Sequence, residues 1–247
     1  MQYAGSAFIN QKKMEKAMMS KRGLYREEFE HGSCGIGFVA HLKGRKSHSI
    51  ILQGLDILRN MTHRGAEGAD SKTGDGAGIM IQVPRDFYLI QGYSLPPEGH
   101  FGTGLLFMPR DTGDAAKCEE ILLKIIGEEG VSFIGFREVP RDNSVIGDIA
   151  KAAEPYIKQI LVSADIPGDD LERKLYIIRK RAEKAIRESD ISQKHFFYMP
   201  SLSTRVLVYK GMLTSLQLSE YFTDLTDERL QSGLALVHSR FSTTTFP

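Results

Sequence analysis

The residue best suited to covalent chemistry is Cys34, one of two cysteines in a chain of 247 residues. It stands in HGSCGIGFVAHL, directly before a Gly-x-Gly and an apolar run that is typical of a strand. Glycines beside a thiol leave room for a ligand or a second backbone to come close. The pattern predicts a nucleophile or, as the plainer alternative, a buried thiol at a strand edge.

The second cysteine, Cys118, is predicted to be structural. In AAKCEEILLKII it shares a helical stripe with Ile121, Leu122 and Ile125. Because a buried free cysteine usually behaves as a small hydrophobic residue, we expect Cys118 in the core.

Metal and phosphate sites are the next alternatives. His31, Cys34, His41 and His48 could supply metal ligands, but their spacing matches no C-x2-C or H-x3-5-H pattern. The glycine-rich run at 74–78 is followed by a predicted strand, where a phosphate loop needs a helix. We therefore expect a tight turn that enters a strand.

Two arginine-bearing segments follow predicted elements, THRGAEGAD at 62–70 and HSRFSTTTFP at 238–247. Loops in such positions often carry binding groups. Arg240 with Thr243 would suit the carboxylate of an amino acid, since a guanidinium offers a planar fork and a hydroxyl adds a donor. A surface ion pair is the plainer interpretation for either arginine.

The elements that would position these residues form a mixture of clustered strands and separate helices. After a strand at 34–42, Ser47 is a possible N-cap of a helix with one apolar face, and Gly65 lies just past its end. Clustered strands favour a layered α+β arrangement over regular βαβ alternation. The further expected segments are a strand at 79–83, strands in GTGLLFMP and VSFIGFREVP, helices at 114–129 and 168–189, and strands at 195–209 and 234–240.

Composition limits the partners. With 32 basic and 31 acidic residues, the chain lacks the field that holds nucleic acid or an anionic membrane. No apolar run approaches the roughly 18 residues of a membrane span. In the first 33 residues, lysines interrupt every apolar run and glutamates are frequent, unlike in secretory or organellar targeting signals. With only two cysteines, a reducing, cytoplasmic location is expected.

Taken together, the segments resemble the N-terminal glutaminase domain of glutamate synthase large subunits, which are class II glutamine amidotransferases of the N-terminal-nucleophile hydrolase type. The resemblance runs from Cys34 to the last residue in the order of the family. Three segments carry it: CGIGFVAHLKG, GLDILRNMTHRGAEGADSKTGDGAGIMIQVP and ALVHSRFSTTTFP. The central block is specific to glutamate synthases, whereas other class II enzymes share only its His-Arg-Gly core.

The resemblance implies a four-layer α/β/β/α fold, here incomplete at its C-terminus, in a domain at 34–247 behind a propeptide at 1–33. Removal of that leader would make Cys34 the first residue, so that its α-amine could activate the thiol. Cys34 would attack the side-chain amide of glutamine and release ammonia through a thioester. Arg64 would lie beside the nucleophile, and Arg240 with Thr243 would hold the substrate α-carboxylate.

In complete glutamate synthases the ammonia passes to 2-oxoglutarate at a separate domain with FMN and an iron–sulfur cluster. The resemblance therefore implies no cofactor or metal in this chain. As partners it implies glutamine, the remainder of the large subunit and a small electron-donating subunit. Pro247 ends the sequence before the family's Asn-Gly oxyanion hole, so we expect little glutaminase activity from these 247 residues alone.

Two other functions remain open at this point. The chain could be a truncated, non-catalytic module that binds an amino acid or pairs with a synthase subunit. It could also be a Cys/His hydrolase with His238 or His63 as base, which would need no processing but leaves the central block unexplained.

Overall fold

The structure is a computed structural model that describes residues 35–62 and 72–239, and these form an α+β fold with two sheets. Every strand pair within the described ranges is antiparallel, in agreement with the predicted fold class. In spatial order, one sheet contains β1 (Ile36–Ala40), β7 (Leu234–His238), β2 (Ala77–Gln82) and β6 (Val206–Gly211), and the other contains β3 (Phe101–Met108), β5 (Tyr156–Ser163) and β4 (Ser132–Glu138).

The helices include the three that amphipathic periodicity predicts, together with shorter ones. In the described part of the chain they are α2 (His48–Asn60), α3 (Arg85–Ile90), α4 (Thr112–Glu128), α5 (Asp148–Ala153), α6 (Gly168–Glu188) and α7 (Gln217–Tyr221). Short 3-10 turns occur at Asn143–Val145, Lys194–Phe196 and Thr223–Thr226. Across the described ranges, no helix combines the length and the apolar character that a bilayer crossing needs.

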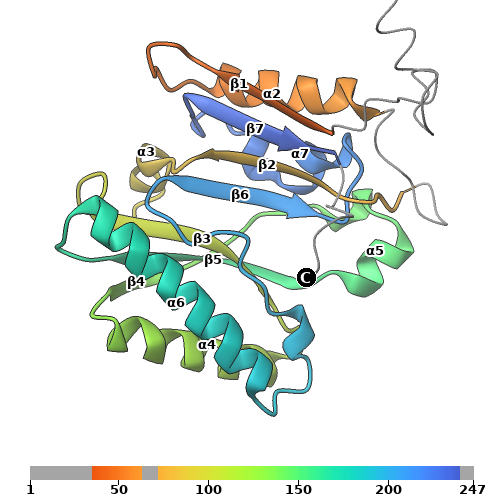
Figure 1. Ribbon diagram of the computed structural model, residues 1–247. Coiled ribbons are helices and arrows are strands. Elements are labelled where there is room, and N and C mark those ends of the chain that lie inside the picture. The colour runs from red at the N-terminus through yellow and green to blue at the C-terminus, as the bar shows by residue number, and fades with distance from the viewer. Residues whose placement is uncertain (1–34, 63–71, 240–247) are drawn as a thin grey trace, which may run out of the picture. The chain divides into compact units, whose positions relative to one another are not determined.

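Helix α2 covers one face of the four-stranded sheet (Figure 1). The predicted apolar face is confirmed, since its members Ile50, Ile51, Leu55 and Leu58 are buried. Gly54 lets the helix approach closely, because a Cβ there would lie 2.8 Å from the Ala235 side chain on β7. Helix α2 and the strands β1 and β7 therefore pack closely against one another.

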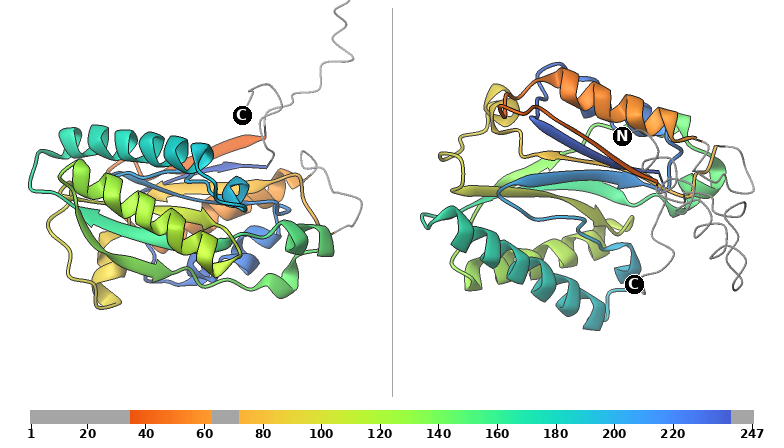
Figure 2. Two further views of the ribbon diagram at one scale, coloured as in Figure 1. Left: turned by 90° about the horizontal axis from the view of Figure 1, so that it is seen from below. Right: turned by 45° about the horizontal axis from the view of Figure 1, so that its top comes forward.

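Helices α4 and α6 lie side by side over the three-stranded sheet (Figures 1 and 2). They share a second hydrophobic cluster with Leu106 of β3 and Ile160 of β5. Cys118 of α4 is fully buried in this cluster, so the prediction that it is a core residue is confirmed.

The two sheets are linked through the segment that precedes β6. Ser203 pairs with Thr103 of β3 through two backbone hydrogen bonds of 3.0 Å, and Tyr198 pairs with Phe107. The predicted strand at 195–209 is therefore wrong in its first half. A 3-10 turn and a run along the edge of β3 come first, and the continuous strand begins only at Val206.

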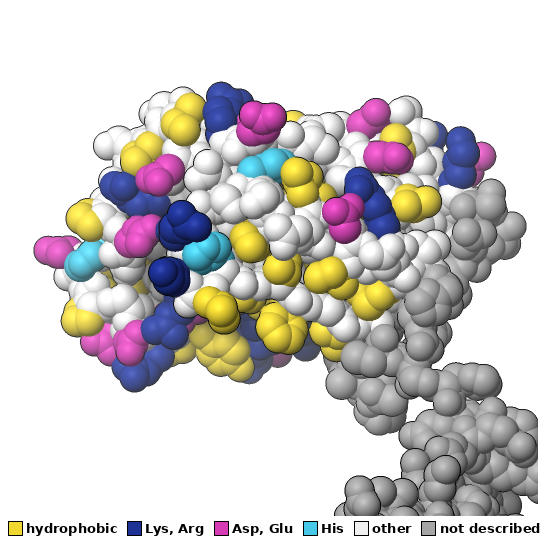
Figure 3. All heavy atoms as spheres, turned by 90° about the horizontal axis from the view of Figure 1, so that it is seen from above, with side chains coloured by type: hydrophobic (Ala, Val, Ile, Leu, Met, Phe, Trp, Pro, Cys, Tyr) yellow, Lys and Arg dark blue, Asp and Glu magenta, His cyan; other side chains and the backbone are white. Residues whose placement is uncertain are grey.

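The face of the four-stranded sheet opposite α2 exposes apolar side chains. Ile36 and Phe38 of β1 are 59% and 70% exposed, whereas Gly37 between them faces Ile57 of α2. Figure 3, which views the molecule from above Figure 1, shows apolar side chains gathered between charged ones on the surface seen there.

The turn before β2 depends on glycine, as the sequence predicts for residues 74–78. Gly76 has a φ of 128°, which only glycine adopts readily, and a Cβ on Gly74 would lie 2.3 Å from the backbone of Leu213. The close approach joins the start of β2 to the loop that follows β6.

We expect Gly74→Ala to destabilise the fold by about 1–3 kcal/mol, because the added carbon must displace backbone. The free energy of unfolding in urea measures this. Gly127→Ala in α4 is the matched control, since a Cβ there meets nothing within 4 Å and alanine favours a helix. Equal stability of the two variants would contradict the steric argument.

Candidate active site

The four site residues predicted from the sequence, Cys34, Arg64, Arg240 and Thr243, all lie outside the described residues, as does His63. The structure does describe the elements from which the chain leads to each of them. The arrangement of these elements therefore indicates whether the four residues can lie near one another.

The chain leaves toward Cys34 and toward Arg240 from adjacent points. In the β1–β7 pair Ile36 is opposite His238, and the Ser239 amide donates a 2.8 Å hydrogen bond to the Gly35 carbonyl. Gly35 directly follows Cys34, and Ser239 directly precedes Arg240. One backbone hydrogen bond thus joins Gly35 and Ser239, the residues next to Cys34 and Arg240 in the sequence.

The carboxyl end of α2, from which the chain leads to Arg64, lies at the same end of the sheet. A Cβ on Gly37 would lie 2.4 Å from Cγ2 of Ile57 and 3.7 Å from Cε of Met61, the residue that caps the helix. Strand β2 also starts there, since Gly78 is opposite His238. The segments that carry all four predicted residues therefore attach to a single end of the four-stranded sheet.

Two basic side chains flank a glycine on the open face at this end. A Cβ on Gly78 would lie 2.3 Å from Nε2 of His238 and 2.9 Å from Cβ of Lys210, so only glycine admits both neighbours. His238 is on the same face as Ile36, two positions after Cys34. The histidine that the Cys/His alternative would use as its base is therefore close to the strand that follows the cysteine.

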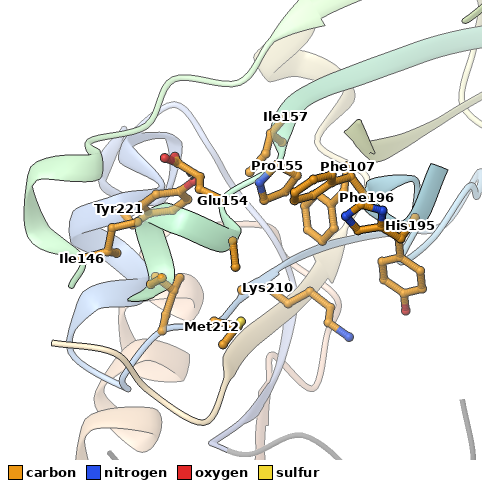
Figure 4. A pocket seen from close by; sticks show the side chains of 15 residues that line it. Phe107, Ile146, Glu154, Pro155, Ile157, His195, Phe196, Lys210, Met212 and Tyr221 are labelled. Atoms are coloured by element: carbon orange, nitrogen blue, oxygen red, sulfur yellow. Dashed lines mark hydrogen bonds between the residues drawn. The ribbon is translucent and has the colours of Figure 1, made fainter. Parts of the chain in front are cut away.

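A pocket of about 380 Å³ opens near the end of β6, a size that suits a small molecule. Figure 4 shows Tyr221 and Glu154 on one side of it, with the rings of Phe107, Phe196 and His195 on the other. Sequence reasoning missed this pocket. Its walls come from five separate stretches of the chain, and no motif connects them.

The carboxylate in the pocket is already engaged. Glu154 accepts hydrogen bonds from the Tyr221 hydroxyl at 2.7 Å and from Nε of Arg141 at 3.2 Å. Burial, followed by the hydrogen bond to Glu154, raises the pKa of Tyr221 above its ordinary value, so the phenol stays neutral and donates. Glu154, Tyr221 and Arg141 can therefore stabilise the pocket or bind a ligand, but none of the three is a nucleophile.

The residue types that could bind a metal do not cluster in the part of the chain that the structure describes. No three His, Cys, Asp or Glu side chains there lie close enough together to hold a metal ion. His48 makes a 2.9 Å hydrogen bond with the Leu230 carbonyl, and His41 accepts from the Lys43 amide at 3.2 Å. These two histidines have separate structural partners.

Comparison with known proteins gives one family and several relatives. The family of class-II glutamine amidotransferases matches residues 34–247. The chain is similar to the glutamate synthase [NADPH] large chain of Bacillus subtilis (strain 168), at 42% identity over 93% of this chain and 15% of the relative. It is 37% identical to glutamate synthase [NADH] of Saccharomyces cerevisiae, over 92% of this chain and 11% of the relative. A chloroplastic, ferredoxin-dependent glutamate synthase of Oryza sativa subsp. japonica is 39% identical over 88% and 14%. The chain thus spans 11–15% of the length of these three relatives.

Proposed function

Because the chain belongs to the class II glutamine amidotransferases, we propose that it is the glutaminase part of a glutamate synthase, with Cys34 as its N-terminal nucleophile. One observation carries the proposal: the family match begins at residue 34, the cysteine that the sequence singles out. Identity of 37–42% to glutamate synthases that use NADPH, NADH or ferredoxin supports the choice of enzyme.

The chemistry needs a free amino terminus at Cys34. An α-amine has an ordinary pKa of about 7.7–8.0, so near neutral pH it can take the thiol proton, which an amide nitrogen cannot do. Sγ then attacks the side-chain carbonyl carbon of glutamine, and the C–N bond breaks as the nitrogen takes up a proton and leaves as ammonia. Water attacks the resulting thioester, which releases glutamate and restores the thiol.

Arg64, Arg240 and Thr243 complete the proposed site. Arg64 fixes the nucleophile, and Arg240 forms a planar, two-pronged pair with the substrate α-carboxylate, helped by the Thr243 hydroxyl. The support is the attachment of their segments to one end of the sheet, next to Gly35.

The finer architecture is also a proposal, namely a four-layer α/β/β/α fold with a leader at 1–33 and the enzyme domain at 34–247. The apolar side chains on the open face of the four-stranded sheet support it, since that face offers Ile36 and Phe38 to a second sheet. Covering them would also exclude water from the thioester.

The resemblance to glutamate synthases implies further parts for the complete enzyme. We propose that it passes ammonia to 2-oxoglutarate in the cytoplasm, with FMN, an iron–sulfur cluster and a small electron-donating subunit outside this chain. Protein-bound clusters take cysteine thiolates, usually four. This chain has two cysteines, and Cys118 is fully buried, so its residues do not fit a cluster.

The mass of the purified protein tests the proposal. We expect the leader to be removed between Ser33 and Cys34, so that the measured mass fits a chain starting at Cys34. A non-catalytic binding module has no reason to lose its leader. A protein that keeps Met1 and still hydrolyses glutamine would contradict the role of the α-amine.

A further inference from the structure

We propose that the pocket near the end of β6 binds a small, flat aromatic molecule that carries one negative charge. The residues that line it lie outside the segments that carry the resemblance, and the proposed reaction uses none of them. The proposal therefore adds a ligand site to the chain and does not depend on the role of Cys34.

The lining of the pocket runs from solvent into the core. Ile146, Ile157 and Leu213 are only 3%, 2% and 3% exposed, whereas Tyr198 and Met212 are 42% and 43% exposed. A ligand can thus enter from solvent and bury most of its surface against apolar side chains. The volume of about 380 Å³ lies in the range of small-molecule sites and suits a ligand of two fused or linked rings.

Aromatic rings form one wall of the pocket. Phe107, Phe196 and His195 lie together on one side of it (Figure 4). The ring centroids of His195 and Phe196 are 4.4 Å apart, and Phe107 packs with Tyr198 at 5.9 Å. Aromatic rings attract further rings in offset or edge-on contacts, with centroids about 4.5–7 Å apart. This wall therefore favours an aromatic ligand over an aliphatic one of the same size.

Hydrogen bonds hold another wall in place. The side-chain amide of Gln217 donates hydrogen bonds of 2.8 Å to the carbonyls of Lys72 and Val145. The Gly147 amide donates to the same Lys72 carbonyl at 3.0 Å. Ile146, which lines the pocket, lies between these two anchored residues. Because the wall is already ordered, a ligand does not have to supply the free energy of ordering it.

The charges at the pocket favour a negative ligand. Among the described residues that line it, Glu154 is the only acid, and its carboxylate already accepts hydrogen bonds from Tyr221 and Arg141. Lys210 supplies positive charge, since its Nζ lies 5.2 Å from the centre of the Tyr198 ring. A carboxylate or sulfonate on the ligand, placed toward Lys210, adds a charge-assisted contact that an uncharged ring lacks.

Two fluorescent probes test the site in the 247-residue chain. Anilinonaphthalene sulfonate is aromatic and anionic, and phenylnaphthylamine has the same rings without the sulfonate. Ala153→Trp fills the pocket and should weaken binding of both probes by at least about tenfold. Ala152→Trp is the matched control, because both alanines are exposed on α5 and Ala152 does not line the pocket. We expect the control to keep the parent's affinities, and both variants to melt close to the parent.

Lys210→Met tests the charge of the ligand. It should weaken binding of anilinonaphthalene sulfonate by about two- to fivefold and leave phenylnaphthylamine unaffected, whereas Lys210→Arg should keep both affinities. Equal affinities in the two tryptophan variants would overturn the site. An equal response of both probes to Lys210→Met would overturn the negative ligand. Displacement of either probe by glutamine would show that the pocket serves the proposed reaction, and would overturn the additional site while leaving the proposed function standing.

Discussion

Cys34→Ala is expected to reduce glutamine hydrolysis by at least about 10³-fold, because the substitution removes the sulfur that forms the thioester in the proposed mechanism. The proposed substrate-binding residues Arg240 and Thr243 are unchanged in this variant, so it should still bind glutamine. The measurement is ammonia release from glutamine by this chain extended through the family's Asn-Gly segment.

Cys118→Ala is the matched control for thiol loss. Its side chain is fully buried between α4 and the three-stranded sheet, so the change should cost about 1 kcal/mol of stability and leave the hydrolysis rate nearly unchanged. Hydrolysis that persists in Cys34→Ala would refute the nucleophile. A comparable loss in Cys118→Ala would show that the assay reports unfolding instead of chemistry.

The elements that could be predicted from the sequence are those with a simple period. Helix α2 follows from apolar residues at helical spacing, of which Ile51 and Leu58 are fully buried. Strand β5 was missed because its interior is buried on both faces, with Ile160 and Leu161 both fully buried, so no alternation marks it. Helix α3 spans only six residues, too few for a period to stand out.

The candidate site shows the same division between local and distant information. The resemblance implies roles for Cys34 and Arg240, but it does not give the register of β1 against β7, which pairs residues about 200 positions apart in the sequence next to these two. The aromatic run before Pro200 looked like a strand because aromatic residues favour strands. Its true position, along the edge of β3, depends on a pairing that no local pattern encodes.

A buried ion pair is the clearest example of a contact between residues far apart in the sequence that no local pattern predicts. Arg137 of β4 was expected only as a strand residue, yet it is 6% exposed and forms a two-pronged pair with Asp224, at 2.8 and 2.6 Å. Its Nε donates to Gln91 at 2.7 Å, and Nη1 lies 3.2 Å from the Gln159 side-chain oxygen. Tyr209 of β6 donates to Asp224 at 3.0 Å. The network thus links the two sheets through polar side chains.

Arg137→Ala should destabilise the fold by about 3–5 kcal/mol, since it leaves the Asp224 carboxylate buried without its counter-charge. Burial raises the pKa of Tyr209 well above its ordinary value, so this phenol remains a neutral donor and cannot replace the lost charge. The free energy of unfolding in urea is the measurement.

Two comparisons separate the buried charge from the loss of side-chain volume. Arg173→Ala removes the arginine of an exposed pair with Asp170, whose side chains are 73% and 55% exposed, and should change stability by less than about 0.5 kcal/mol. The double variant Arg137→Met with Asp224→Leu should be more stable than Arg137→Ala, because it removes both charges and keeps apolar volume. If the double variant proved less stable than Arg137→Ala, the linkage would depend on the hydrogen bonds of the network and not on the unpaired charge.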